Sequence, residues 1–133
     1  AGLRPFARLR TWRASLEAAP DALAECGARR LEVDLDEVTY DVSLAEPGTL
    51  PPEGEAPFLI AEVEVMVPPS QEAVDGAAAS LEAFLARRGL EGAPKAHSKL
   101  LEYLRRFRPS HLQALARAGT LPPGTLQRLG VTP

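Results

Sequence analysis

The chain has 133 residues, the size of one ordinary domain, and we expect it to fold around a single hydrophobic core. Hydrophobic residues make up 45% and charged residues 25% of the chain, a balance that excludes a disordered tail and a fibrous repeat. The net charge of −3 argues against a nucleic-acid partner, and no apolar run approaches the roughly 20 residues of a membrane span.

The small net charge conceals a segregation of charge along the chain. Positions 1–16 carry four arginines and no acid, positions 17–91 carry seventeen acids against four arginines, and positions 92–133 carry seven basic residues against one acid. The single cysteine, Cys26, cannot form an internal disulfide and is expected to be a small buried side chain, which favours a reducing, cytoplasmic location. Because the chain begins with Ala1 and strand-like sequence follows at once, we expect it to be a piece of a longer protein.

The first predicted element is a strand over 6–13, where the residues alternate between two faces. One face of this strand carries Phe6, Arg8, Arg10 and Trp12. The other face carries Arg13 together with smaller residues, and no function is predicted for this second face. The alanine-rich stretch at 16–27 contains Pro20 and predicts a poorly defined turn or a short helix.

Two further strands are predicted to carry acidic side chains. Apolar residues alternate strictly with acids over 31–36, and a similar alternation returns over 58–67. Between them, the proline- and glycine-rich stretch 45–57 predicts a surface loop. The most informative acids on these two strands are Asp34, Asp36, Glu62 and Glu64.

Helices are predicted for the last part of the chain. Ser70 is placed to cap the first helix, and Gly89 ends it. A second helix is predicted to start at Pro94 and to end before Pro109, and a third, shorter helix precedes Gly119. The second helix is expected to bury Leu100, Leu101, Leu104 and Phe107, with Lys99, Tyr103 and Arg106 on a shared side.

The strand acids admit two interpretations. Alternate positions in a strand place side chains roughly 7 Å apart on one face, and like charges that face each other across strands repel. A divalent cation would remove this repulsion, and oxygen ligands on a rigid sheet suit Mg²⁺ or Mn²⁺. The alternative is that the acids form the solvated face of an antiparallel sheet.

The basic residues admit a similar choice. Arg8 and Arg10 present planar forks that match phosphate oxygens, or they are simply solvated. Lys99, near the start of a predicted helix, adds a positive charge for a phosphate, or it is an ordinary surface lysine. No catalytic or binding role is predicted for Trp12 and Tyr103, whose rings are expected to pack against other residues. His97 and His111 are expected to lie at the surface or at a helix end.

In combination, acids on two strands, arginines on a third and a late helical lysine are what metal-assisted phosphoryl transfer requires. Three sequence blocks, at 31–36, 61–65 and 98–109, resemble the C-terminal half of the thiamine triphosphatases, which belong to the CYTH superfamily of triphosphate tunnel metalloenzymes. The block at 98–109 reads Lys-Leu-x-x-Tyr-Leu-x-Arg-Phe-Arg-Pro from Lys99 and carries most of the specificity. The resemblance covers about 3–115.

The resemblance implies an α+β fold, an antiparallel β-barrel tunnel of the CYTH type with flanking C-terminal helices, of which only the C-terminal portion is present. Positions 1–118 are the predicted part of the CYTH domain, and 119–133 a turn-rich tail. The family's E-x-E-x-K motif does not occur here. By position, the resemblance implies that Asp34, Glu62 and Glu64 bind the metal and that Arg10 and Lys99 bind the triphosphate. Asp36 matches the pattern without an assigned ligand role.

The implied activity is the Mg²⁺-dependent hydrolysis of thiamine triphosphate to thiamine diphosphate and phosphate by a metal-activated water, with Mn²⁺ as an alternative metal and no catalytic side chain assigned. Two alternatives stay open, hydrolysis of inorganic triphosphate and a non-catalytic polyanion-binding module. The expected partner is a small-molecule triphosphate, and the expected location is the cytoplasm. The complete protein is expected to be a monomer, whereas open strand edges predict that this chain alone dimerises or aggregates.

Overall fold

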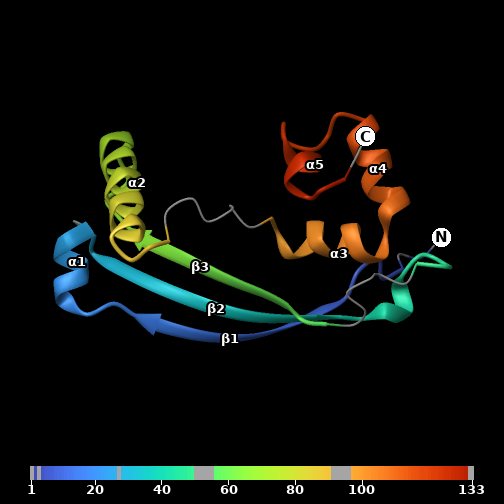
Figure 1. Ribbon diagram of the computed structural model, residues 1–133, viewed down its shortest axis with the longest axis horizontal. Helices are drawn as coiled ribbons and strands as arrows, with labels where there is room; N and C mark the ends of the chain where they lie inside the picture. Colours follow the sequence, from blue (N-terminus) through green and yellow to red (C-terminus); the bar gives the residue numbers. More distant parts are fainter. Residues whose placement is uncertain (1, 3, 27, 50–55, 91–96, 132–133) are drawn as a thin grey trace. The chain divides into compact units, whose positions relative to one another are not determined.

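The computed structural model describes the chain except for residues 1, 3, 27, 50–55, 91–96 and 132–133, with only the backbone of Cys26 (Figure 1). The predicted burial of Cys26 and the predicted helix start at Pro94 therefore lie outside the described residues. The fold is α+β, as predicted, with an open antiparallel sheet of three strands in the order β1-β2-β3. A closed tunnel stays a prediction.

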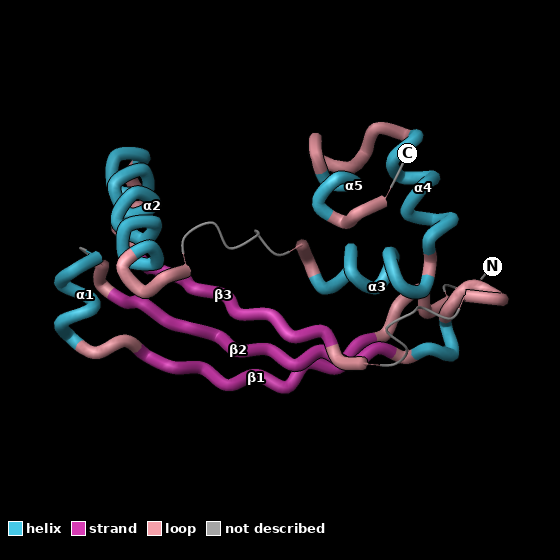
Figure 2. Tube along the Cα trace, viewed as in Figure 1, coloured by secondary structure: helices cyan, strands magenta, loops and turns pink. Residues whose placement is uncertain are grey.

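Strands and helices follow one another in chain order (Figure 2). The strands are β1 (Leu9–Glu17), β2 (Arg30–Tyr40) and β3 (Phe58–Met66). The helices are α1 (Pro20–Cys26), α2 (Gln71–Ala86), α3 (Lys99–Phe107), α4 (Pro109–Arg117) and α5 (Thr125–Arg128), with a short 3₁₀ helix η1 (Val42–Leu44) after β2. Within the described ranges, no helix combines the length and the apolar character needed to cross a bilayer.

The chain divides into two compact units, each with its own cluster of buried side chains. The first unit comprises Ala1–Trp12, Glu37–Leu59 and Ala96–Pro133, and the second comprises Arg13–Asp36 and Ile60–Lys95. The single core expected from the length is therefore wrong, since the described residues form two core clusters.

The core of the second unit lies where helices α1 and α2 pack side by side (Figure 1). Leu31 on β2 and Phe84 on α2 are both buried there, with apolar residues of α1 and β3 around them. Ser70 caps α2 as predicted, because its hydroxyl accepts a hydrogen bond from the backbone N–H of Ala73 at 3.2 Å. Gly89 follows the helix with a φ of +71°, a backbone conformation that favours glycine.

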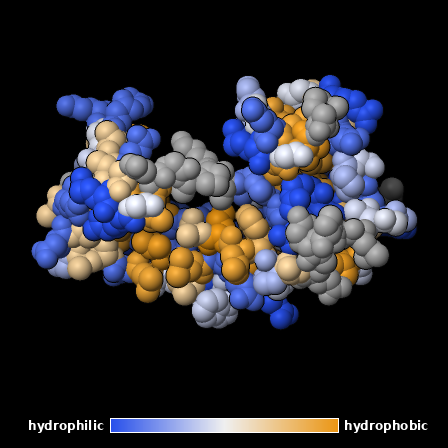
Figure 3. Space-filling view, in the orientation of Figure 1, coloured by the Kyte–Doolittle hydropathy of each residue, from blue (hydrophilic) through white to orange (hydrophobic). Residues whose placement is uncertain are grey.

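The core of the first unit is built on α3 and α4. Its fully buried members include Tyr103 and Phe107, whose rings both pack against the ring of Tyr40 with centroids 5.7 Å away. Apolar side chains are visible between hydrophilic atoms at α4 and α5 (Figure 3). The predicted packing of Tyr103 is confirmed, but the predicted burial of Leu100 is wrong, since Leu100 is 48% exposed.

A loop residue caps helix α4 from a distance. Arg108 precedes this helix, but its side chain forms no capping hydrogen bond, and Pro109 is the first helical residue. Instead, the carboxylate of Glu46 accepts hydrogen bonds from the backbone N–H groups of Ser110 and His111, each at 3.2 Å. The backbone N–H of Glu46 also donates to the carbonyl of Phe107 at 2.8 Å. This part of the 45–57 stretch is therefore fixed to the end of α3 and the start of α4.

Strands β1 and β2 differ most from the sequence prediction. β1 runs over Leu9–Glu17 rather than 6–13, and the ring of Phe6 instead packs at a tilt against the ring of His111, with centroids 4.8 Å apart. β2 extends beyond the predicted end at Asp36 to Tyr40, because Val38, Thr39 and Tyr40 are residue types that favour strands. The predicted packing of Trp12 is also wrong, because its side chain is 66% exposed on β1.

Candidate functional site

The candidate site lies on strands β2 and β3 in the second unit. Strand alternation turns Asp34 of β2 and Glu62 and Glu64 of β3 toward one another. One carboxylate oxygen from each of the three lies within 4.8 Å of the others. Asp34 is buried, Glu62 is half-buried and Glu64 is exposed, so the cluster is open to solvent on one side. The three residues predicted as metal ligands are thus together, and their role as ligands stays a prediction.

Arg13 of β1 contacts this cluster, and the sequence interpretation had given it no role. Its guanidinium forms ion pairs with Asp34, with Asp36 at 2.7 Å and with Glu62 at 2.8 Å. The hydrogen bond with Asp36, together with the nearby negative charges, raises the pKa of Arg13 above its ordinary value despite the opposing effect of desolvation. Arg13 therefore stays charged, and it offsets part of the negative charge that the carboxylates concentrate here.

The buried acids of the site are held in place by specific partners. Ser15, two positions after Arg13 and on the same face of β1, donates its hydroxyl to Asp34 Oδ1 at 2.5 Å. Asp36, which has no exposed side-chain surface, receives both the Nε and the Nη2 hydrogens of Arg13. In the described part of the chain, every buried side-chain nitrogen or oxygen has a hydrogen-bond partner.

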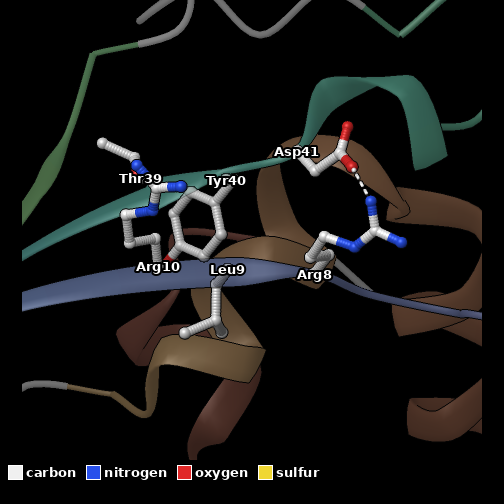
Figure 4. A pocket seen from close by; sticks show the side chains of 6 residues that line it. All are labelled: Arg8, Leu9, Arg10, Thr39, Tyr40 and Asp41. Atoms are coloured by element: carbon white, nitrogen blue, oxygen red, sulfur yellow. Dashed lines mark hydrogen bonds and ion pairs between the residues drawn. The ribbon is translucent and has the colours of Figure 1, made fainter.

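Arg10, predicted to bind the triphosphate, belongs to the first unit, whereas the carboxylate cluster belongs to the second. Along β1, Arg10 and Arg13 are three positions apart, so alternation turns them to opposite faces of the strand. Arg10 lines an open groove of about 490 Å³ whose other lining residues are Arg8, Leu9, Thr39, Tyr40 and Asp41 (Figure 4). Arg8 pairs with Asp41 in this groove at 3.2 Å.

Lys99, the second predicted triphosphate ligand, is the first residue of α3 and also belongs to the first unit. It is half-buried, and its backbone carbonyl accepts a hydrogen bond from the hydroxyl of Tyr40 at 2.9 Å. The helix-start position expected from the sequence is confirmed. Lys99 is not among the described residues that line the groove around Arg10.

The rest of the 98–109 block is mainly structural. Glu102 is buried and accepts hydrogen bonds from Arg105 at 2.9 Å and from Arg106, and it lies 2.5 Å from the ring nitrogen of His97. Burial alone would raise the pKa of Glu102, but the hydrogen bonds from Arg105, His97 and Arg106 outweigh it and lower the pKa to about 2. This buried ion-pair cluster was not expected from the sequence. His97 lies next to the start of α3, as predicted, and His111 is exposed, as predicted.

Comparison of the chain with protein-family models, with curated proteins and with solved structures found no match.

Arg13 and Ser15 are the site residues that sequence analysis missed. The sequence places Arg13 on the face of β1 opposite to Arg10, which is correct, but the predicted strand ends at Arg13 and no role is predicted for that face. Because β1 continues to Glu17, Arg13 and Ser15 lie on the same face of the strand. From that face both side chains contact Asp34 of the neighbouring strand β2. The available signal was a basic residue and a hydroxyl at alternate positions, next to a strand that carries acids at alternate positions.

Proposed function

We propose that this chain supplies the cation-binding part of a phosphohydrolase that cleaves a triphosphate, with thiamine triphosphate as the substrate that the family resemblance implies. The observation that carries the proposal is the convergence of Asp34, Glu62 and Glu64 within 4.8 Å. A cytoplasmic location and Mg²⁺ as the physiological cation are parts of the same proposal.

The residues present fit a divalent cation. All three candidate ligands offer carboxylate oxygens, the ligand type that Mg²⁺ and Mn²⁺ prefer. Arg13 pairs with Asp34, Asp36 and Glu62, so one positive charge faces three carboxylates, and Glu64 adds a fourth negative charge beside Asp34 and Glu62. The exposed Glu64 leaves the cation accessible to water and to a phosphate from solvent.

In the proposed reaction, an oxygen of water forms a bond to the terminal phosphorus, and the bond from that phosphorus to the bridging oxygen breaks. The bridging oxygen leaves with the diphosphate, and the proton of the water passes to solvent. A bound divalent cation would supply neutralisation of the phosphate charge. Asp34, Glu62 and Glu64 would hold this cation, Ser15 orients Asp34 through its hydrogen bond, and Arg13 keeps a positive charge beside Asp34.

The test is a calorimetric titration of Mn²⁺ and Mg²⁺ into the 133-residue chain and its variants. We expect Glu64→Ala to weaken Mn²⁺ binding by at least about tenfold, because a divalent ion loses one of three anionic ligands. Glu82→Ala on the exposed surface of α2 is the matched control and should leave binding unchanged. Equal Mn²⁺ affinities for Glu64→Ala, Glu82→Ala and the unmodified chain would refute the cation site.

A substrate panel separates the proposed reaction from the alternatives. Phosphate release from thiamine triphosphate, tripolyphosphate and ATP distinguishes the thiamine ester from inorganic triphosphate as substrate. The non-catalytic alternative, a polyanion-binding module, is favoured by one observation, the open groove lined by Arg8 and Arg10. Binding of tripolyphosphate that is lost in Arg10→Gln, without phosphate release at any Mg²⁺ concentration, would favour this module over the hydrolase.

A further inference from the structure

In the first unit, the two faces of strand β2 have different surroundings. Val38 has no exposed surface, and the ring of Tyr40 packs against aromatic rings of α3, so this face belongs to the core. Strand alternation turns Glu37 and Thr39 to the opposite face, where both are exposed. We call this second side the open face of the first unit.

The open face carries the two most exposed large apolar side chains of the described residues. Trp12 of β1 is 66% exposed and Leu59 of β3 is 70% exposed. Trp12 is next to Arg13, and Leu59 lies three positions before Glu62, so alternation turns both onto the same face as Glu37. A solvated face of an antiparallel sheet usually carries polar side chains, so a large aromatic and a leucine there indicate a contact surface.

Two opposite charges lie on either side of Trp12. Arg10 is two positions before it on β1 and on the same face. The backbone N–H of Asp41 donates to the carbonyl of Arg8 at 2.9 Å, a pairing that places Glu37 of β2 opposite Trp12. The side chains of Arg10 and Glu37 form no ion pair or hydrogen bond with any described residue. The open face therefore presents one positive and one negative charge that the single chain does not pair.

We propose that the open face is the contact surface between two copies of this chain, related by a twofold axis that lies in the plane of contact and passes beside Trp12. A twofold contact must be self-complementary, and this axis brings Arg10 of each copy to Glu37 of the other. Trp12 packs against Trp12 of the second copy, and Leu59 extends the apolar contact.

The charges favour a second copy as the partner. An acidic or a basic partner would leave either Arg10 or Glu37 facing a like charge, whereas a second copy pairs both. The inference is independent of the proposed cation site, and it places the association on a face of the sheet rather than on the open strand edges expected from the sequence. Because one tryptophan and one leucine per copy make a small apolar centre, we expect a dissociation constant of about 1 to 100 μM.

The experiment measures self-association of the 133-residue chain by sedimentation and by tryptophan fluorescence. Trp12 is the only tryptophan of the chain, so its emission reports its burial directly. Dilution from about 200 μM to about 0.2 μM should convert dimer to monomer and move the emission to longer wavelengths. Trp12→Ser and Leu59→Ser should each weaken the dimer at least about tenfold, measured by sedimentation. Met66→Ser is the matched control, because Met66 is 59% exposed on the other face of β3.

Reversing the charges gives a result that only this arrangement predicts. Arg10→Glu leaves two negative charges on the open face and Glu37→Arg leaves two positive ones, so each variant should repel its own copies and sediment as a monomer. An equimolar mixture of the two should dimerise, because both ion pairs form again with their signs exchanged. Glu82→Arg, on the exposed surface of α2, should dimerise like the unmodified chain.

Three results would overturn the inference. The first is a monomer at every concentration up to about 200 μM. The second is a dimer that Trp12→Ser and Leu59→Ser leave unchanged, which would place the contact on the strand edges. The third is a failure of Arg10→Glu and Glu37→Arg to associate when mixed, while circular dichroism shows both to be folded. None of these results bears on Mn²⁺ binding, so the proposed function is tested separately.

Discussion

Replacing Glu102 by glutamine tests the buried ion-pair cluster of the first unit. The pKa of Glu102 is about 2, against an ordinary value of 4.5, so the folded state favours the ionised carboxylate. At about 1.4 kcal/mol for each factor of ten in proton affinity, this difference contributes ~3 kcal/mol to stability at neutral pH. This value is an upper limit, because the side chain of Arg105 is 26% exposed and water weakens its interaction with Glu102.

The sign of the pH dependence follows from the lowered pKa. The contribution is complete above pH 4.5 and is lost as the pH falls toward 2, because the unfolded chain takes up the proton first. Between pH 6 and pH 3, the unmodified chain should lose about 2 kcal/mol from this group. Because glutamine does not titrate, the unfolding free energy of Glu102→Gln should lack this part of the pH dependence. At neutral pH the variant should be about 3 to 5 kcal/mol less stable than the unmodified chain, because Arg106 is left buried without its carboxylate partner.

Urea unfolding monitored by circular dichroism at several pH values between 6 and 3 measures both effects. The informative quantity is the difference in unfolding free energy between Glu102→Gln and the unmodified chain, since other carboxylates contribute equally to both. The exposed Glu82→Gln provides the control and should follow the unmodified chain. If the difference between Glu102→Gln and the unmodified chain stays constant across this pH range, the reasoning about Glu102 is refuted.

Two further predictions concern the second unit. Phe84→Ala should lower the unfolding free energy by about 3 to 5 kcal/mol, because Phe84 is 6% exposed and central to its cluster; a loss below about 1 kcal/mol in urea unfolding would contradict this. Ser70→Ala should cost about 1 kcal/mol by removing the cap of α2, whereas Ser80→Ala within the same helix should cost less, and equal thermal midpoints for the two variants would count against the cap.

The acidic cluster was accessible to sequence analysis because it depends on local alternation. Asp34, Glu62 and Glu64 each follow a strict two-residue period, and the faces of β2 and β3 follow from that period alone. The cap at Ser70 is local in the same sense, since it depends on residues three positions apart.

What could not be predicted depends on pairing between distant segments. The role of Arg13 requires the register of β1 against β2, which no local pattern specifies. The burial of Glu102 in an amphipathic helix contradicts its residue type and is explained only by Arg105, Arg106 and His97 around it.

The attachment of Glu46 to helix α4 has a consequence for how the chain can vary among relatives. The helix start and the entry to the loop share one set of hydrogen bonds, so loss of the Glu46 carboxylate should loosen both segments at once, whereas position 111 supplies its backbone N–H with any residue except proline. A second attachment lies at the far end of the same stretch, where the backbone carbonyl of Ala56 accepts a hydrogen bond from Arg106 of α3 at 2.6 Å. Insertions between 41 and 46 should therefore be costly, because they would pull the Glu46 carboxylate away from the start of α4.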